Sequence, residues 1–250
     1  MFAKLRSIAS RKLNPRPIVE PKPQKRTWDV AQQYELDHAY GFMSEQFFVE
    51  LFAQFQRGEM QTSKGYMNDL LVREFFENAP HLFHDFLSAI QGKACLDIGP
   101  CVFSPLLTWD GIGEAYAIEP LGESVRDWQR KRFGNSAFDR LNLKSIGADV
   151  FLPDLVGRID GAIHCRNMLD HTPNWPFVLA NISAYAAPGC HFLFWTDIDH
   201  GGTADEGHFD ICPDSLSLKR LIEQLGFAVQ RELEDKNRHE RNWGCFAIKR

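Results

Sequence analysis

The chain has 250 residues, of which 44% are hydrophobic and 24% charged, so it can bury one large α/β core. Its six cysteines are scattered with no Cys-x-x-Cys pair, which argues against a zinc ribbon or a disulfide framework and favours a reduced compartment. Because no apolar run approaches the roughly 20 residues that cross a bilayer, the predicted location is the cytoplasm.

Charge separates residues 1–26 from the rest of the chain. This segment holds eight Lys or Arg against one acid, Glu20, for a net charge of +7, so the total of −5 leaves −12 on the remaining residues. Four prolines within residues 14–24 predict an extended linker. We interpret 1–26 as a basic, flexible, solvated arm, with weak attachment to the inner face of the membrane as the alternative. The acidic body argues against a nucleic-acid partner.

Residues 27–91 predict an N-terminal helical region. One helix is expected from about 28 to 57, and further helices are expected at about 67–78 and 81–90. Aromatic and aliphatic residues recur in the first helix at three- and four-residue steps, which is typical of a core-facing stripe. The stripe consists of Phe47, Phe48, Leu51, Phe52 and Phe55.

After Gly92, short apolar runs alternate with amphipathic stretches, which predicts an α/β domain over residues 92–250. We expect a Rossmann-like, seven-stranded, mostly parallel sheet with helices on both faces. A helix over about 213–225 is expected to end at Gly226. The strands are predicted at about 94–98, 114–118, 144–147, 160–165, 191–196, 227–232 and 242–248.

Polar residues follow the predicted strands, where ligands of open α/β sheets bind. In "DIGPCVFSP", Gly99 permits a tight turn, and Ser104 before Pro105 is typical of a helix start. Glu119 follows the second strand and can accept hydrogen bonds from two ribose hydroxyls. Asp149 follows the third strand and is expected to face an adenine amino group. These positions predict an adenosyl-binding edge.

The motifs "CLDIGPCVFSPL", "AIEP" and "IDGAIHCRNMLDHTPNWPFVLANISAYAAPGCHFLFW" occur in the order found in class I S-adenosylmethionine-dependent methyltransferases, which the chain resembles over about residues 92–250. It is also loosely similar to bacterial methyltransferases of sugar and surface-polysaccharide synthesis. The resemblance implies S-adenosylmethionine as cofactor. The cofactor-binding residues that it implies are Asp97, Gly99, Pro100, Cys101, Glu119, Pro120, Asp149, Val150, Arg166 and Asn167.

The first motif departs from the family's Gly-x-Gly-x-Gly pattern, because it reads Gly99, Cys101 and Phe103. If Cys101 needs a positive φ, the strain is on the order of 1 kcal/mol. Phe103 is expected to pack inward against the short following helix. A nicotinamide-binding Rossmann domain is the competing interpretation. The altered turn argues against it more strongly than against a methyltransferase, because the pyrophosphate of a nicotinamide cofactor needs the second glycine and S-adenosylmethionine has no pyrophosphate.

His171, in "LDHTP", is the first candidate for the base that takes a proton from a hydroxyl acceptor. The alternative is a structural histidine that holds the loop. The segment 196–210 contains four Asp, one Glu and two His, and from it we select Asp199, His200 and His208 as further catalytic candidates. The acids and histidines of this segment are expected to act as a base with its orienting partners, to bind a divalent cation or to hold sugar hydroxyls. The alternative is a solvated acidic lid. No metal ligand is assigned.

The function expected from this pattern is methylation of a hydroxyl on a small molecule or a glycan. The alternative is a non-catalytic binding or scaffold protein with the same fold, which the altered glycine motif favours. Trp28, Tyr34 and Tyr40 are candidates for an acceptor pocket, with burial in the core as the alternative. The acceptor itself has no general sequence code.

Overall fold

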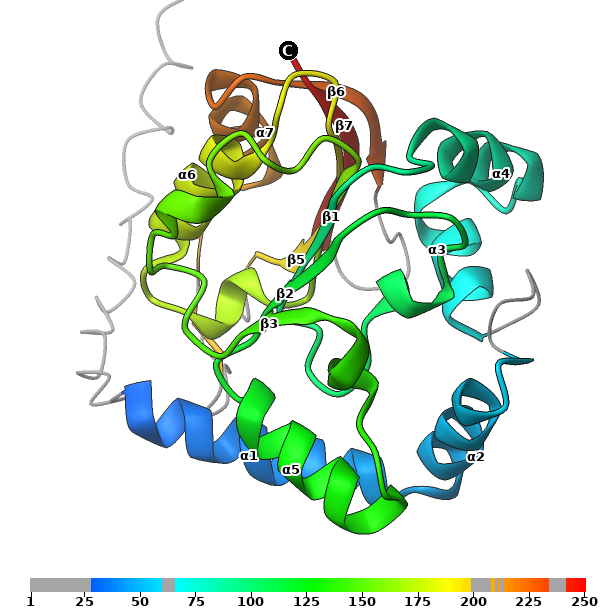
Figure 1. Cartoon of the computed structure of the whole chain (residues 1–250). Coiled ribbons are helices and arrows are strands. Elements are labelled where there is room, and N and C mark those ends of the chain that lie inside the picture. The colour runs from blue at the N-terminus through cyan, green and yellow to red at the C-terminus, as the bar shows by residue number, and fades with distance from the viewer. Residues whose placement is uncertain (1–27, 60–65, 199–207, 210, 212–213, 234–241) are drawn as a thin grey trace, which may run out of the picture.

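The computed structural model describes residues 28–59, 66–198, 208–209, 211, 214–233 and 242–250. They form a seven-stranded sheet of order β3-β2-β1-β4-β5-β7-β6, in which β7 is antiparallel to both neighbours (Figure 1). This confirms the expected α/β fold. The strands are β1 (Cys95–Ile98), β2 (Ala115–Ile118), β3 (Asn142–Lys144), β4 (Ala162–Arg166), β5 (His191–Asp197), β6 (Phe227–Leu233) and β7 (Asn242–Lys249).

Helices cover both faces of the sheet, as expected. One apolar core joins the sheet to α6 and α7, and a second joins it to α3 and α4. A third joins α1, α2 and α5, and α1 and α5 lie side by side along one end of the sheet (Figure 1). The helices are α1 (Trp28–Ser44), α2 (Gln46–Gln56), α3 (Tyr66–Phe75), α4 (Pro80–Ala89), α5 (Gly122–Phe133), α6 (Trp175–Tyr185) and α7 (Ser215–Gln224).

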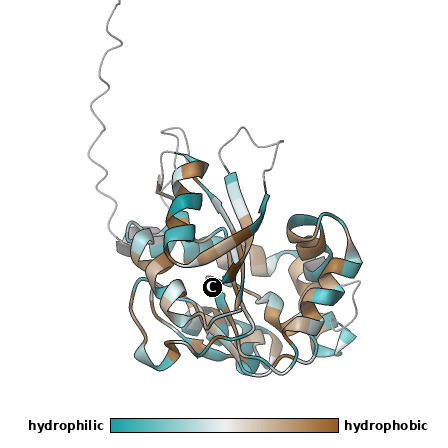
Figure 2. Cartoon of the chain, turned by 90° about the horizontal axis from the view of Figure 1, so that it is seen from above, coloured by the Kyte–Doolittle hydropathy of each residue, from teal (hydrophilic) through white to brown (hydrophobic). Residues whose placement is uncertain are grey.

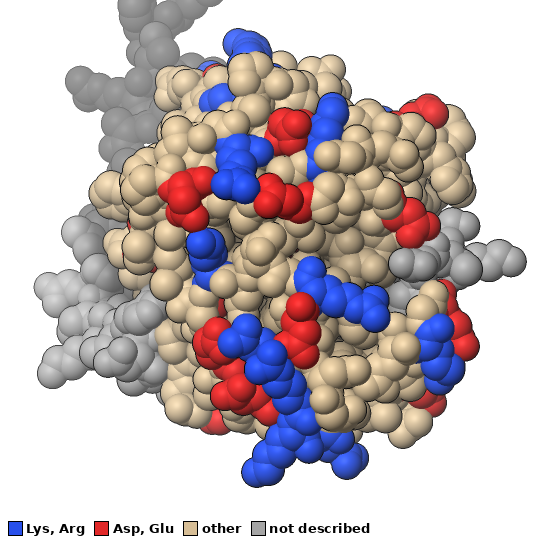
Figure 3. All heavy atoms as spheres, in the orientation of Figure 1, with Lys and Arg blue, Asp and Glu red and all other residues tan. Residues whose placement is uncertain are grey.

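The arm at residues 1–26 and the candidates Asp199 and His200 lie outside the described residues, as does the side chain of Trp28. Among the residues that are described, no helix is long and apolar enough to cross a membrane. Lysine and arginine are interspersed with acidic residues on the face seen in Figure 3. Arg158 and Glu114, 2.9 Å apart, form one exposed ion pair.

Two predicted boundaries are wrong for local reasons. The helix expected to continue from 28 to 57 breaks at Glu45, whose extended backbone separates α1 from α2. The third strand is Asn142–Lys144 and not 144–147. Ile146 follows this strand and packs against the core from a loop, so its apolar character reflects loop burial rather than strand pairing.

Two local signals agree with the structure. Ser104 caps the short 3₁₀ helix η2 (Pro105–Thr108) by accepting a hydrogen bond from the Leu106 backbone. Gly226 follows α7 with a φ of +88°, the left-handed backbone expected after a helix. The aromatic stripe of α2 is buried except at Phe47, which is 40% exposed.

Side chains of the central strands alternate between the two faces of the sheet. In β1, Leu96 and Ile98 pack toward α6, whereas Cys95 packs toward α3 and α4. Asp97 therefore projects to the α3 side, where His164 of β4 lies directly opposite in the ladder. Hydrophobic residues concentrate in the strands, between helices that also carry hydrophilic residues (Figure 2).

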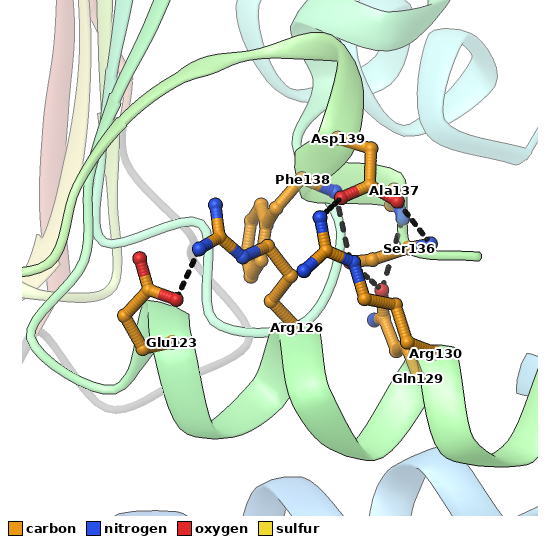
Figure 4. A network of polar contacts seen from close by, with 8 residues as sticks. All are labelled: Glu123, Arg126, Gln129, Arg130, Ser136, Ala137, Phe138 and Asp139. Atoms are coloured by element: carbon orange, nitrogen blue, oxygen red, sulfur yellow. Dashed lines mark hydrogen bonds and ion pairs between the residues drawn. The ribbon is translucent and has the colours of Figure 1, made fainter.

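Gln129 of α5 supports the turn that follows β1. Its buried amide donates to the Val102 carbonyl oxygen at 2.8 Å and accepts from the Ser136 hydroxyl at 2.7 Å and the Ala137 amide at 3.0 Å. Ser136 and Asp139 form a capping box at the start of the 3₁₀ helix η3 (Ala137–Arg140), which follows α5 (Figure 4). Since every polar atom of this amide has a partner, the network fixes α5 against the turn.

Candidate cofactor and active site

Two adjoining cavities lie where β1, β2 and β4 end. The larger has a volume of about 340 Å³, within the range of roughly 300–1,000 Å³ that small-molecule sites occupy, and the smaller has about 80 Å³. Glu35 lines both cavities, so α1 forms part of their wall. The other residues shared by the two are Gly99, Cys101, Asn167 and His171.

The turn after β1 requires left-handed backbone at two positions. Gly99 has a φ of +70°, and a Cβ there would lie 2.6 Å from the Met168 Cβ, so this glycine is needed for space as well. Cys101 has a φ of +55°, which meets the condition under which strain was expected at this position. Its side chain is exposed, so the strain of about 1 kcal/mol is not offset by burial of the thiol.

Replacing Cys101 by Val is expected to destabilise the fold, because a β-branched residue is poorly tolerated at positive φ. A loss of about 1–2 kcal/mol lowers the melting temperature by roughly 2–8 °C. Cys101→Gly keeps the same backbone N–H and relieves the strain, so this matched control should melt at or above the temperature of the parent. Equal melting temperatures for the two variants would show that the turn is not strained.

Phe103 does not fill the site. Its ring is 5% exposed and packs edge-to-face on Phe55 of α2, at 5.4 Å between centroids. The ring forms part of the wall of the larger cavity, which stays open beside it. The expectation that it packs inward is therefore correct, and its core cluster includes Phe55 of α2 and Leu107 of the short helix that follows.

Asp97 and His164 form a buried pair in the larger cavity. Asp97 Oδ1 lies 2.8 Å from His164 Nδ1, and both side chains are almost fully buried. Among the described residues, Asp97 Oδ2 and His164 Nε2 have no hydrogen-bond partner. In the tautomer that donates its Nδ1 proton to the carboxylate and carries none on Nε2, His164 Nε2 is an acceptor beside Asp97 Oδ2. The pair therefore offers two buried acceptors, which suit an ammonium group.

Glu119 clamps the turn to the end of β2. Its Oε2 accepts from the Cys101 amide and its Oε1 from the Leu121 amide, each at 3.0 Å. A carboxylate oxygen accepts more than one hydrogen bond, so ribose hydroxyls can still bind here. Glu119 lines the smaller cavity, whose other walls are largely apolar and which adjoins the larger cavity.

Burial raises the pKa of Glu119 from 4.5 to about 7, although the hydrogen bonds from Leu121 and Cys101 act to lower it. The folded state thus holds this proton more tightly than the unfolded chain does. Its contribution to stability is present below pH 4.5 and is lost as the pH rises toward 7.

The remaining predicted cofactor residues are placed differently. Pro100 and Asn167 line the larger cavity and Pro120 the smaller one. Arg166 also lines the larger cavity, but its guanidinium makes two hydrogen bonds of 2.7 Å to Glu74 of α3. In the described part of the chain, Asp149 and Val150 lie outside both cavity linings. Asp149 accepts a hydrogen bond of 2.7 Å from Asn174.

His171 and His208 come together although they are 37 positions apart in the sequence. Their ring centroids are 4.4 Å apart. The Nδ1 atom of His171, in the 3₁₀ helix η5 (Leu169–His171), lies 3.0 Å from Glu35 Oε1. Asp170 is fully buried, and its carboxylate lies 4.0 Å from His171 Nε2 and 3.9 Å from His208 Nε2. The structure thus gathers two acids around two imidazoles.

Carboxylates surround His171 and change its acidity. Burial acts to lower its pKa, but contact with Glu35 and the charges of Asp170 and Glu119 raise it to about 9. The imidazole is therefore protonated at neutral pH in the ligand-free protein. A bound cation or the loss of that proton must precede any role as a base.

Sequence reasoning missed three residues of the site. Glu35 and His164 lie 136 and 7 positions from His171, and only the packing of α1 and the β1–β4 register bring them to the cavities. Asp170 is directly beside His171 in the sequence, so "LDH" contains a signal for it. Of the acceptor-pocket candidates, Tyr34 lines the larger cavity, whereas Tyr40 stacks on Trp128.

No family model and no curated protein matches the chain. Solved structures do. The [4+2]-cyclase SpnF is 15% identical with a TM-score of 0.51, over 89% of this chain and 95% of that chain. An S-adenosylmethionine-dependent methyltransferase from Mesorhizobium loti is 14% identical with a TM-score of 0.48, over 68% and 96%. One from Aquifex aeolicus is 15% identical with a TM-score of 0.46, over 72% and 93%.

At these identities the likeness concerns the fold alone. The strand order, with β7 antiparallel between β5 and β6, differs from the all-parallel order of dinucleotide-binding Rossmann domains. The chain therefore has a Rossmann-like fold with an antiparallel seventh strand, and it shares this fold with the solved structure of SpnF.

Proposed function

We propose that the protein is an S-adenosylmethionine-dependent methyltransferase that acts on a hydroxyl of a small molecule or a glycan. The observation that carries the proposal is the buried Asp97–His164 pair, with its two unpartnered acceptors among the described residues, beside the Glu119 clamp. A ligand with an ammonium group at one end and ribose hydroxyls at the other satisfies both. S-adenosylmethionine has this arrangement.

When bound, S-adenosylmethionine supplies a methyl group on a positively charged sulfur. Asp97 and His164 hold the ammonium end, and Glu119 holds the ribose. The carboxylates around the cavities attract the cation. The protein's main contribution is alignment, because in-line displacement is accelerated chiefly by fixing the nucleophile against the methyl carbon.

The acceptor is expected in the larger cavity, near Glu35, His171 and His208. A hydroxyl must lose its proton as it attacks, and the Glu35–His171 pair is the group positioned to receive that proton once His171 has given up its own. The polar wall on this side also suits hydroxyl-rich acceptors. The proposal of a sugar acceptor rests on this polar wall and on the sequence resemblance.

The proposal is tested by incubating the protein with methyl-labelled S-adenosylmethionine and a panel of hydroxylated small molecules and oligosaccharides. We expect label on an acceptor oxygen and an equal amount of S-adenosylhomocysteine. Label appearing only on nitrogen or sulfur acceptors in a matched panel would overturn the assignment to oxygen.

A non-catalytic binding protein is the second candidate. Its support is that both Glu119 oxygens already accept backbone hydrogen bonds and that Cys101 replaces a glycine. The two candidates differ in cofactor affinity. Saturable binding of S-adenosylmethionine at micromolar concentration supports the enzyme, and its absence at millimolar concentration supports the binding protein.

Cofactor affinity should depend on pH through Glu119, whose pKa is about 7. The ionised carboxylate accepts ribose hydrogen bonds and attracts the sulfonium, so binding is expected to tighten between pH 6 and 8, by at most about tenfold per pH unit. Calorimetry at both pH values measures this. Glu119→Gln, which does not ionise, should lose the dependence. The same pH dependence in that variant would assign it to another group.

A further inference from the structure

We propose that Glu35, His171 and His208 form a binding site for one divalent transition-metal ion at the wall of the larger cavity. The three side chains come from α1, from η5 and from the segment after β5. Each offers a ligand atom within 4.8 Å of the others. All three residues line the larger cavity, so an ion held by them faces the space assigned to the acceptor.

One pair of these atoms has the spacing of two ligands on one ion. Glu35 Oε1 and His171 Nδ1 lie 3.0 Å apart. Two ligands at about 2.1 Å from a metal, and at 90–110° to each other, are about 3.0–3.4 Å apart. Both atoms are buried, and the ion pair between them is the contact that a bound metal ion would replace. An ion next to both would satisfy them together.

Asp170 supplies the outer support that metal-binding histidines usually have. Its buried carboxylate lies at 3.9–4.0 Å from the Nε2 atoms of both histidines, and the Thr196 hydroxyl donates to it at 3.3 Å. A carboxylate on the Nε2 side of His171 orients the ring so that Nδ1 faces Glu35. The arrangement therefore places the His171 imidazole between the Asp170 carboxylate and the proposed ion.

The donor set indicates the class of metal. Two imidazole nitrogens and one carboxylate oxygen favour borderline ions such as Zn²⁺, Co²⁺ or Fe²⁺ over Mg²⁺ and Ca²⁺, which prefer oxygen. Three protein ligands leave coordination positions open. If the proposed methyl transfer is correct, a hydroxyl bound at an open position loses its proton more readily, because the ion stabilises the alkoxide.

The site is tested by titrating the full-length, untagged, chelator-treated protein with Co²⁺. We expect saturable binding of one equivalent, with visible absorption bands of a nitrogen- and oxygen-ligated ion and without the intense near-ultraviolet bands of a cobalt–thiolate bond. Zn²⁺ should displace the cobalt. Failure to bind either ion, or thiolate bands that disappear in Cys101→Ser, would overturn the proposal.

Variants then assign the ligands. His171→Ala, His208→Ala and the near-isosteric Glu35→Gln should each weaken Co²⁺ binding by about tenfold or more. His84→Ala is the matched control, since His84 is an exposed histidine on α4, outside both cavity linings in the described part of the chain, and it should bind as the parent does. Parental affinity in all three ligand variants would contradict the assignment. Circular dichroism identifies any variant that has not folded. If a histidine variant is unfolded, the Co²⁺ affinity of Glu35→Gln, which preserves side-chain volume, tests the assignment.

A parallel titration with S-adenosylmethionine separates this proposal from the proposed function. Cobalt binding without cofactor binding would leave the metal site standing and overturn the methyltransferase. Cofactor binding without cobalt binding would overturn the metal site and leave the methyltransferase proposal standing.

Discussion

Replacing His171 by Ala is expected to lower the rate of methyl transfer by about 10²–10⁴-fold, the usual contribution of a group that assists proton removal. The imidazole lies against Glu35 and beside His208 in the larger cavity, whereas the acceptors assigned to the cofactor belong to Asp97 and Glu119. The affinity for S-adenosylmethionine should therefore change little.

The measurement is single-turnover transfer at saturating cofactor, together with the dissociation constant of the cofactor in the same variant. His84→Ala is the control, because His84 is an exposed histidine of α4 outside both cavity linings in the described part of the chain. Full activity of His171→Ala would remove this residue from the reaction. A large loss of cofactor affinity would instead give it a structural role in the cavity wall.

Replacing Glu119 by Ala is expected to weaken cofactor binding by about 10–150-fold. A hydrogen bond to a charged group contributes about 1.5–3 kcal/mol, and each 1.4 kcal/mol is tenfold in affinity. The substitution also releases the amides of Cys101 and Leu121, so the turn loses the clamp that fixes its position. Both effects act in the same direction.

Equilibrium dialysis with labelled S-adenosylmethionine measures this loss, and thermal melting reports whether the fold remains. Glu123→Ala is the matched control, since Glu123 is an exposed acid in the first turn of α5, a few residues beyond the clamp. Parental affinity in Glu119→Ala would place the ribose elsewhere. Loss of affinity in Glu123→Ala would show that general charge, and not the clamp, attracts the cofactor.

The sequence predicted the sheet well because buried strands are short apolar runs with strong boundaries, as in β4 and β5. It did not show that β7 lies antiparallel between β5 and β6, because strand order depends on tertiary packing. The break at Glu45 was missed for the same reason. Phe42 and Phe48 pack edge-to-face across this break, and helical periodicity alone does not distinguish such packing from one continuous helix.

The site was predictable where its residues follow strand ends. The cavity is lined by Gly99, Glu119 and His171, which follow the ends of β1, β2 and β4. The left-handed backbone of Gly99 was also expected from the sequence. Glu35 was not predictable, since its place depends on how α1 packs across the ends of the strands. His164 was hidden as an interior strand residue, and only the β1–β4 register pairs it with Asp97.

The central claim is that a sulfonium nucleoside binds above the carboxyl ends of the strands even though Cys101 stands where a glycine is expected. Calorimetric titration of the full chain with S-adenosylmethionine at pH 8 tests it most directly. We expect one site with a micromolar dissociation constant. The absence of saturable heat at millimolar cofactor would contradict the claim.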